Sequence, residues 1–440
     1  MVGPTCGPTI PARHMPTAAS STILYATSDA NMKAKAQRGK IKAKGKSKVA
    51  KRKQPSAAVL IRMLQADCHK PFHILSKVGT QLSQSTDSNG RVSSLVLIRL
   101  VKLGMEKMNT AMFASESSGK TSLWEDGDEH SALDTLAKVC STLAAAIESK
   151  SVDLESAVEG IKAAGVLSRI LSTSGVKPDV TSLAMRPLVH SFARVPVDES
   201  MEEHYLSGLK WAYDNLAYSF GAAYEEEEDL MPAHLNKAYR DLDLPFRVRP
   251  GLLDCVAGLT VANLSNQVQF KADIIQTTST GKSVKERRLT AWEGESEDIP
   301  GFAYSSKIME TRPFSPLVRS VRDELRKMTG EGDYNCCLLN LYPDGESGMR
   351  YHIDPDQGEL WGYETAVVSV GAARRFAFRP IPGLQSTSKG KAHNFIVMNG
   401  DVTEMFGQCQ QKFQHTVKTA EGRGEAASRS SLVYKKTLNR

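Results

Sequence analysis

The spacing of apolar residues divides the chain into a helical part and a strand-rich part. Between residues 133 and 147, apolar side chains recur at the three, four and seven intervals of one buried helix face. The same spacing continues over residues 154–161. Stretches that contain Gly and Ser at 85–90 and 115–120 separate such segments. The pattern therefore predicts an α-helical accessory region over about 56–230.

After about residue 243 the pattern changes to short apolar runs bounded by Gly and Pro. Runs of this length that are rich in Val, Phe and Tyr are typical of strands in an antiparallel sandwich or barrel. One longer segment, 316–328, has a helical pattern instead. We therefore expect an α+β chain whose C-terminal part is β-rich, with a helix packed on its outside. The predicted strands lie in the runs VRPGLLDCV, YNCCLLNLY, TAVVSVG, RRFAFRP, NFIVMNGD and SRSSLVYK.

Charge is distributed unevenly along the chain. Residues 1–55 contain a single acid, Asp29, and no apolar periodicity, which predicts a disordered basic leader. Within it, residues 33–53 hold eleven Lys or Arg, so the rest of the chain has a net charge of −4 against +7 for the whole. A second run, EEEED at 225–229, is expected to be a solvated linker after the helices.

The basic leader has several interpretations. It fits a nuclear-import signal, a tether that neutralises nucleic-acid phosphates, or a transit peptide for a mitochondrion or plastid. A solvated tail that carries no targeting signal is a further alternative. The lysine-rich run KVAKRK favours the nucleus, because transit peptides favour Arg.

Two classes of protein are disfavoured by composition. The sequence has no uninterrupted apolar run of roughly 18 residues, so we expect no membrane span. Its seven cysteines are odd in number, scattered and never spaced as CxxC. A disulfide framework or a structural zinc cluster is therefore not expected, and a reducing compartment fits better.

The stretch RYHIDPD at 350–356 places a histidine two residues before an aspartate. Alternate side chains of a strand share a face, so His352 and Asp354 would point to one spot while Ile353 faces the core. An imidazole and a carboxylate are two members of the 2-His-1-carboxylate triad that binds non-haem Fe(II). Taken alone, however, an HxD pair is more often a hydrogen-bonded pair in a loop.

A third ligand would have to come from a distant strand. Two histidines follow downstream, His393 in the polar turn KGKAHN and His415 at the head of the strand-like run FQHTV. The position of His415 in a strand-like run makes it the favoured choice, with His393 as the alternative.

Six motifs follow one another in the C-terminal part: NLY (340–342), RYHIDPD, VSVGAARRFAFR (368–379), NGDVTEM (399–405), QHTV and RSSLVYK (429–435). Their order and spacing resemble the AlkB family of Fe(II)/2-oxoglutarate dioxygenases, and VSVGAARRFAFR is similar to the DNA-repair members of that family. Further upstream, 286–294 and 301–306 are similar to the segment with which that family covers a flipped base. The resemblance covers about 243–440 and leaves the helical region outside.

The resemblance implies a fold and a set of cofactors. Residues 243–440 would form a double-stranded β-helix, or jelly-roll, oxygenase domain, preceded by the helical region (56–230) and the leader (1–55). Its cofactor would be Fe(II), with 2-oxoglutarate and O2 as cosubstrates. His352, Asp354 and His415 would be the metal ligands and therefore the catalytic residues.

Cosubstrate contacts follow from the same resemblance. Arg429 matches the arginine that grips the 2-oxoglutarate carboxylate, a task suited to the planar, two-pronged guanidinium. Asn340 and Tyr342 match residues that hydrogen-bond the cosubstrate. The family's second arginine is replaced by Lys435, which keeps the charge but loses the bidentate fork.

For the substrate, chemistry on a base requires that the base leave its stack. Tyr304 falls where the family's stacking aromatic is expected, with His352 as the opposite face of the sandwich. Asp356 matches an acidic position that contacts the exocyclic group of the base.

Three functions remain open from the sequence. The leading hypothesis is an enzyme that oxidatively demethylates N-alkylated bases of DNA or RNA and releases formaldehyde, succinate and CO2. A second is a 2-oxoglutarate-dependent hydroxylase or demethylase of protein side chains. A third is a nucleic-acid-binding protein with an inactive oxygenase domain. The helical region is expected to be a plain accessory domain. A protein or RNA partner is the alternative, since SGVKPDV (174–180) weakly resembles a turn of the RNA-binding pentatricopeptide repeats.

Overall fold

The computed structural model describes most of the chain beyond residue 90. All described residues fall within one compact unit, Pro55–Arg440. No helix among them is long and apolar enough to cross a membrane. The described ranges are 90–114, 128–221, 230–276, 283–304, 307–330, 333–383, 390–420 and 427–438. The predicted leader (1–55), the start of the predicted helical region (56–89), the break at 115–120 and the acidic run at 225–229 lie outside them.

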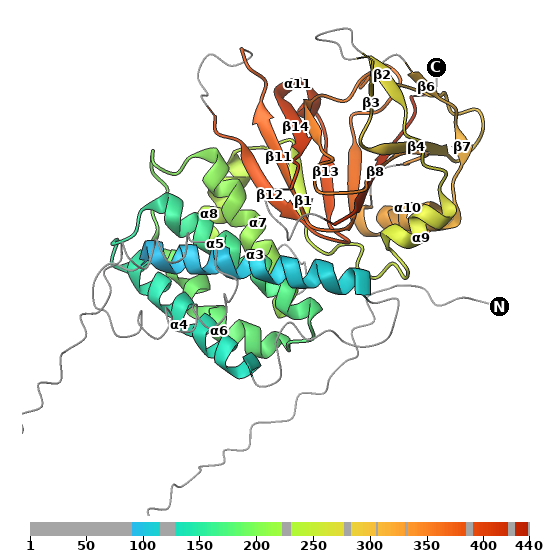
Figure 1. Cartoon of the computed structure of the whole chain (residues 1–440). Helices are drawn as coiled ribbons and strands as arrows, with labels where there is room; N and C mark the ends of the chain where they lie inside the picture. The colour runs from blue at the N-terminus through green and yellow to red at the C-terminus, as the bar shows by residue number, and fades with distance from the viewer. Residues whose placement is uncertain are drawn as a thin grey trace, which may run out of the picture. The chain divides into compact units, whose positions relative to one another are not determined.

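Helices α3 to α8 come first in the chain (Figure 1). Residues 133–147 lie within α4 and residues 154–161 within α5, so both predicted helices are confirmed. Asp153 is the N-cap of α5, and its carboxylate accepts a hydrogen bond from the Ser156 amide at 2.8 Å. The bounds are α3 Gly90–Ala114, α4 Asp128–Glu148, α5 Leu154–Thr173, α6 Pro178–Ser191, α7 Glu203–Phe220 and α8 Ala233–Asp241, with a 3₁₀ turn, η1, at Phe192–Arg194.

A seven-stranded sheet, here called the major sheet, has the order β1-β13-β10-β15-β8-β4-β7. Its strands pair antiparallel, except that β4 and β7 are parallel. The bounds are β1 Phe246–Arg249, β4 Leu289–Gly294, β7 Arg312–Pro313, β8 Cys336–Tyr342, β10 Thr365–Gly371, β13 Val402–Met405 and β15 Arg429–Lys435.

A four-stranded antiparallel sheet, the minor sheet, has the order β12-β11-β14-β9. Two short hairpins, β2–β3 and β5–β6, accompany the sheets. Helices followed by antiparallel sheets make an α+β fold, as predicted. The bounds are β9 Met349–His352, β11 Arg374–Pro380, β12 His393–Val397, β14 Phe413–Val417, β2 Ile274–Gln276, β3 Ser283–Lys285, β5 Phe302–Tyr304 and β6 Lys307–Met309.

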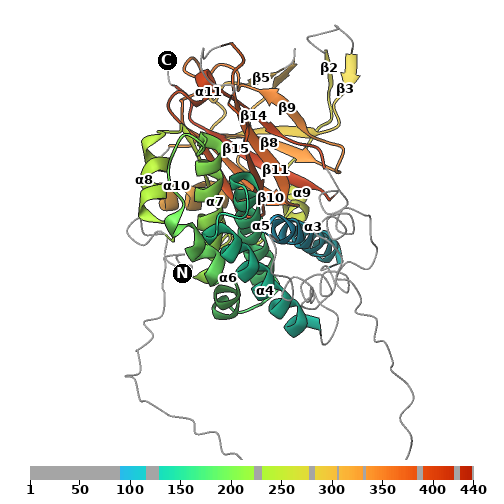
Figure 2. The same ribbon diagram turned by 90° about the vertical axis from the view of Figure 1, so that its left-hand side faces the viewer.

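The two faces of the major sheet differ in character. On the outer face, Leu339, Val368 and Leu432 belong to a buried core together with Val318 and Val321 of helix α10. This helix, Pro316–Thr329, confirms the predicted outer helix, and α9 (Val261–Gln267) lies beside it (Figure 1). Helix α11 (Cys409–Lys412) directly precedes β14 (Figure 2). Since side chains alternate along a strand, Asn340 and Tyr342 of β8 and Arg429 and Lys435 of β15 point to the opposite, inner face.

Aromatic residues join the inner faces of the two sheets. Phe246 of β1 stacks on Phe378 of β11, with ring centroids 4.0 Å apart. Helix α7 packs against β12 and β1, and Trp211 of α7 meets Phe395 of β12 edge-on at 5.9 Å. One continuous core therefore includes both the helices and the minor sheet. The predicted boundary between the helical region and the oxygenase region stays a prediction.

Most predicted strands are confirmed, but one is wrong in part. TAVVSVG and RRFAFRP coincide with β10 and β11. VRPGLLDCV was expected to be a strand, yet β1 ends at Arg249 and the following residues form turns. Gly251 has a positive φ of 64°, and its amide donates to the Asp401 carboxylate at 2.7 Å. Proline and glycine together end the strand there, because Pro250 cannot donate to the ladder.

A buried ion pair connects the helices to the sheets. Arg169 of α5 is 3% exposed, and its Nη1 lies 3.0 Å from Oδ1 of Asp401, which is fully buried. Nη2 of Arg169 lies 3.6 Å from Oδ2 of Asp254, and the guanidinium stacks on the ring of Tyr218 at 4.4 Å. Asp401 lies in the predicted NGDVTEM motif, between β12 and β13. A helix therefore supplies the counter-charge for a carboxylate of the sheet region.

We expect Arg169→Met to destabilise the protein strongly. Removing one partner of a buried pair leaves an uncompensated charge, which costs about 3 kcal/mol of unfolding free energy. Urea unfolding followed by circular dichroism measures this. The matched control is Lys237→Met, since Lys237 and Asp241 form an exposed pair within α8. Equal unfolding midpoints for the two variants would contradict the role of Arg169.

Candidate active site

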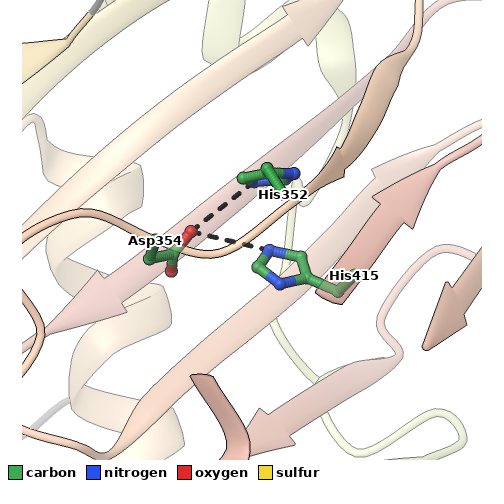
Figure 3. Close-up of side chains that lie close together, drawn as sticks. All are labelled: His352, Asp354 and His415. Carbon is green, nitrogen blue, oxygen red and sulfur yellow. Dashed lines mark ion pairs between the residues drawn. The ribbon is translucent and has the colours of Figure 1, made fainter. Parts of the chain in front are cut away.

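Three predicted metal ligands lie together at the edge of the minor sheet (Figure 3). His352 ends β9, and its strand partner across the ladder is His415 of β14. Asp354 follows β9 by two residues, and its Oδ1 lies 3.6 Å from Nε2 of His352 and 3.5 Å from Nε2 of His415. The three ligand atoms all lie within 4.8 Å of one another.

This geometry fits a metal ion. Nitrogen and oxygen ligands of one transition metal at right angles lie about 3 Å apart, so a small inward movement completes the site. Nδ1 of His352 donates to the carbonyl of Arg350 at 2.8 Å, which leaves the lone pair of Nε2 for a metal. Nδ1 of His415 has no hydrogen-bond partner within the described ranges. Two imidazoles and one carboxylate are the donor set of non-haem Fe(II) sites.

The electrostatics of the cluster favour metal-binding protonation states. Burial lowers the pKa of His415 to about 3, and nearby His352 adds to this. Burial alone would raise the pKa of Asp354, but Lys435, His415 and His352 together hold it well below its usual value. A neutral imidazole and an ionised carboxylate are the forms that bind metals.

Two details of the sequence prediction were wrong. β9 ends at His352, so Asp354 is not in the strand, and Ile353 is 48% exposed instead of facing the core. Asp354 precedes Pro355, and a residue before proline is restricted in conformation. His393 does not lie in a polar turn but begins β12, buried and hydrogen-bonded through Nδ1 to Ser207 of α7 at 2.7 Å. His415, and not His393, joins the cluster.

Arg429 lies on the inner face of the major sheet and is completely buried. Its Nη2 donates to the Ser369 hydroxyl at 3.1 Å, but Nε and Nη1 have no hydrogen-bond partner among the residues that the structure describes. Burial lowers the pKa of Arg429 to about 10. Free N–H groups on a buried guanidinium are costly unless a ligand meets them, and a carboxylate suits their fork. The residue therefore fits the distal carboxylate of 2-oxoglutarate.

Asn340 and Tyr342 share this inner face. In the ladder between β8 and β15, Asn340 lies opposite Ser431 and Tyr342 lies opposite Arg429. Both are buried, and the Arg429 guanidinium carbon lies 5.6 Å from the centre of the Tyr342 ring. The structure thus brings three of the predicted cosubstrate residues onto adjacent strands.

Lys435 connects the two sheets through Asp354. Its Nζ lies 2.6 Å from Oδ2 of Asp354, 3.3 Å from Oε1 of Gln357 and 3.3 Å from Oγ1 of Thr365. An ammonium has three donors, so all of them have protein partners. Because Oδ1 of Asp354 faces the histidines while Oδ2 binds Lys435, the carboxylate presents one oxygen to a metal. A contact of Lys435 with the cosubstrate stays a prediction.

The predicted substrate residues are described less fully. Tyr304 ends β5, but its side chain lies outside the described part of the structure. Asp356 has a positive φ of 56°, and its carbonyl accepts the amides of Leu360 at 2.9 Å and Trp361 at 3.2 Å. Its carboxylate is half-buried in this turn after the metal residues.

Comparisons with known proteins identify the family. The sequence profile of the 2OG-Fe(II) oxygenase superfamily matches residues 257–434. The uncharacterized protein R406 of Acanthamoeba polyphaga mimivirus is 30% identical over 154 residues, which cover 35% of this chain and 75% of that protein. The chain belongs to the 2OG-Fe(II) oxygenase superfamily.

Further relatives place it among the AlkB-like members. The DNA oxidative demethylase ALKBH2 of Bos taurus is 33% identical over 78 residues, 18% of this chain and 28% of that protein. ALKBH2 of Homo sapiens is 31% identical over 91 residues, 21% of this chain and 33% of that protein. The match thus spans a third or less of these demethylases. The chain is an AlkB-like dioxygenase that uses Fe(II), 2-oxoglutarate and O2.

Several residues of this AlkB-like oxygenase were missed by the sequence interpretation. Gln410 accepts the Asp354 amide through Oε1 at 3.0 Å, and Ser369 accepts from Arg429. Arg288 donates to Oδ1 of Asn340 at 2.9 Å. Only Ser369 carried a signal, as a polar residue inside the apolar run TAVVSVG; the others depend on pairings between distant segments.

Replacing a metal ligand should abolish both metal binding and turnover of the AlkB-like oxygenase. We expect His352→Ala to lose Fe(II) binding, because two remaining ligands do not complete the triad. Calorimetric titration with Mn(II) and a succinate assay measure the two effects. The control is His393→Ala, which changes a histidine outside the cluster. Wild-type succinate formation by His352→Ala would exclude the metal assignment.

Lys435 should govern metal affinity through Asp354. We expect Lys435→Met to weaken metal binding roughly 10- to 100-fold, because outer partners of a ligand orient it. Lys435→Arg should retain binding, since a guanidinium still pairs with Oδ2. Mn(II) titration of both variants tests this. Unchanged affinity in Lys435→Met would show that Asp354 needs no such partner.

Proposed function

We propose that this AlkB-like oxygenase oxidatively demethylates N-alkylated bases in DNA or RNA. The observation that carries the proposal is the combination of two features that strand β15 connects. One is the His352, Asp354 and His415 cluster, and the other is the buried Arg429, whose Nε and Nη1 have no hydrogen-bond partner among the described residues. Arg429 begins β15, and Lys435 at the end of the same strand binds Asp354 of the cluster. The similarity to DNA oxidative demethylases supports a nucleic-acid substrate.

The proposal includes a jelly-roll fold for the oxygenase region. Its support is that two antiparallel sheets meet through the Phe246 and Phe378 rings, with strands that cross between sheets in chain order. β8 lies in the major sheet, β9 in the minor, β10 in the major and β11 in the minor. Metal ligands from the minor sheet would then face cosubstrate residues from the major sheet.

In this mechanism the chain's own residues bind and orient the reactants. Arg429 binds the distal carboxylate of 2-oxoglutarate with its free N–H groups, while Asn340 and Tyr342 hydrogen-bond the same molecule. Lys435 holds Oδ2 of Asp354, so that Oδ1 stays directed at the metal position. When bound, the iron and cosubstrate supply the oxidation: O2 gives one oxygen to 2-oxoglutarate, which becomes succinate and CO2, and one to the N-methyl group, which leaves as formaldehyde.

Base recognition falls to the segments around the cluster. We assign Tyr304 to stacking on the flipped base, with His352 on its other side, and Asp356 to its exocyclic group. These roles follow the geometry that base-modifying enzymes need. The basic leader would bind phosphates without sequence preference and act as a nuclear address, with a mitochondrion or plastid as the alternative.

The test is incubation with methylated oligonucleotides. We expect Fe(II), 2-oxoglutarate and the full chain to remove a methyl group from at least one member of a panel of N-methylated adenine and cytosine oligomers. The panel covers DNA and RNA in single- and double-stranded form. Mass spectrometry of the oligomers and a formaldehyde assay report the reaction.

The Asp354→Ala protein is the negative control for this panel. If the wild-type protein forms succinate but changes the mass of no oligomer, the nucleic-acid proposal is wrong, and protein side chains become the better substrate class. If it forms no succinate under any condition while still binding oligomers, the chain is a nucleic-acid-binding protein with an inactive oxygenase domain.

A further inference from the structure

A chain of buried charged side chains connects the β5–β6 hairpin to Asn340. Nζ of Lys307, the first residue of β6, lies 2.9 Å from Oε2 of Glu286. The other carboxylate oxygen, Oε1, accepts from Nε of Arg288 at 3.2 Å, and Nη1 of Arg288 donates to Oδ1 of Asn340 at 2.9 Å. Glu286, Arg288 and Asn340 are 9%, 6% and 4% exposed. The four side chains thus form a continuous row of hydrogen bonds, here called the polar row, that is almost inaccessible to water.

Lys307 also attaches the hairpin to its surroundings. Its Nζ lies 2.7 Å from Oδ2 of Asp273, just before β2, and 3.0 Å from Oγ1 of Thr290 in β4. Arg288 makes a further contact, from Nη1 to Sδ of Met349 in β9 at 2.8 Å. The row therefore joins both short hairpins to the two sheets. Two cations and two carboxylates balance its charge, so it needs no external counter-ion.

Arg288 determines the orientation of the Asn340 side-chain amide, that is, which of its oxygen and NH₂ group faces the predicted 2-oxoglutarate position. A guanidinium has five donors and no acceptor, so the amide atom that faces it must be the oxygen. The NH₂ group of Asn340 then points away from Arg288. Asn340 lies on the same inner face as Arg429, two ladder positions from the Arg429 and Tyr342 pair. A fixed donor there suits an oxygen of a carboxylate or keto acid.

We propose that Arg288 is a positioning residue that holds Asn340 as a donor to 2-oxoglutarate, and that Lys307 couples the β5–β6 hairpin to this contact. The proposal rests on the cosubstrate role of Asn340 in the proposed function. Cosubstrate binding and order in the hairpin stabilise each other. The hairpin carries Tyr304, so the substrate-covering segment becomes ordered when the cosubstrate is present.

The physical basis is the cost of a half-satisfied buried network. If Lys307 leaves its place, Glu286 loses a partner and Arg288 is less firmly held, because buried polar groups depend on one another. A ligand that accepts a hydrogen bond from Asn340 holds that end of the row in place. The ordered position of Lys307 at the other end is then favoured as well. The coupling free energy is the same in both directions, so 2-oxoglutarate binding stabilises the ordered hairpin by as much as the ordered hairpin strengthens 2-oxoglutarate binding.

Cosubstrate affinity provides the first measurement. The protein is loaded with Mn(II), which fills the metal position without turnover, and titrated with 2-oxoglutarate by calorimetry. We expect Arg288→Met to weaken 2-oxoglutarate binding about tenfold, the effect of one lost hydrogen bond. Arg288→Lys, which keeps the charge beside Glu286, should lie between Arg288→Met and wild type. Mn(II) affinity should stay unchanged in both.

The neighbouring Arg287 offers a matched control. Arg287 pairs with Glu346 at the surface, and its side chain is 65% exposed. Arg287→Met changes the same residue type one position away without touching the row, so its 2-oxoglutarate affinity should equal that of wild type. In steady-state assays, Arg288→Met should raise KM for 2-oxoglutarate and leave kcat at saturation nearly unchanged, a split that general destabilisation does not produce.

Hydrogen–deuterium exchange tests the coupling to the hairpin. In the wild-type protein with Mn(II), adding 2-oxoglutarate should slow exchange in β5 and β6. In Lys307→Met this protection should disappear, and in Arg287→Met it should persist.

Each part has a result that overturns it. If Arg288→Met binds 2-oxoglutarate as tightly as the wild-type protein does, the positioning role is disproved. If 2-oxoglutarate does not change the exchange rate of the hairpin amides in the wild-type protein, the coupling is disproved. A wild-type protein that does not bind 2-oxoglutarate overturns both parts together with the cosubstrate site. The calorimetric and hydrogen-exchange measurements use no nucleic acid, so a failure to demethylate any oligonucleotide does not alter their outcome.

Discussion

The alternation of side chains along β8 and β15 is the constraint on which the site depends. In a strand, neighbouring residues face opposite sides, so one register places all the polar groups together. Asn340, Tyr342, Arg429 and Lys435 all face inward, while Leu339, Leu432 and Tyr434 pack with α10 on the outer face. A shift of one residue would exchange the two sets. The apolar outer face therefore fixes the register that the inner chemistry needs.

Three buried ion pairs in the described part of this protein join segments that are distant in sequence. Arg169 of a helix pairs with Asp401 between two strands, Lys435 with Asp354, and Lys307 with Glu286. Each pair joins parts of the chain that are separated in sequence. Such pairs add little stability over apolar packing, but they cannot be broken singly without leaving a charge in the core. They act as restraints on geometry.

The sequence predicted the local features of the site better than its connections. The HxD spacing and the position of His415 in a strand-like run were sufficient to predict the three residues of the metal cluster. The conformation after His352 was missed, because Pro355 and the turn at Asp356 take the chain out of the strand. The burial of His393 was missed too, since its partner is a helix residue far upstream. Arg288 gave no signal, as its role appears only when β4 lies beside β8.

All three N–H donors of the Lys435 ammonium have protein oxygens as partners, and this has a consequence for inhibitor design. A competitive inhibitor shaped like the cosubstrate would find in Arg429 a buried guanidinium with two nitrogens, Nε and Nη1, that have no partner among the residues that the structure describes. Lys435 would offer such a compound no free donor. Compounds that carry an extra carboxylate for Lys435 should therefore gain no affinity from it. Affinity for this oxygenase would have to come from Arg429 and its neighbours on the inner face.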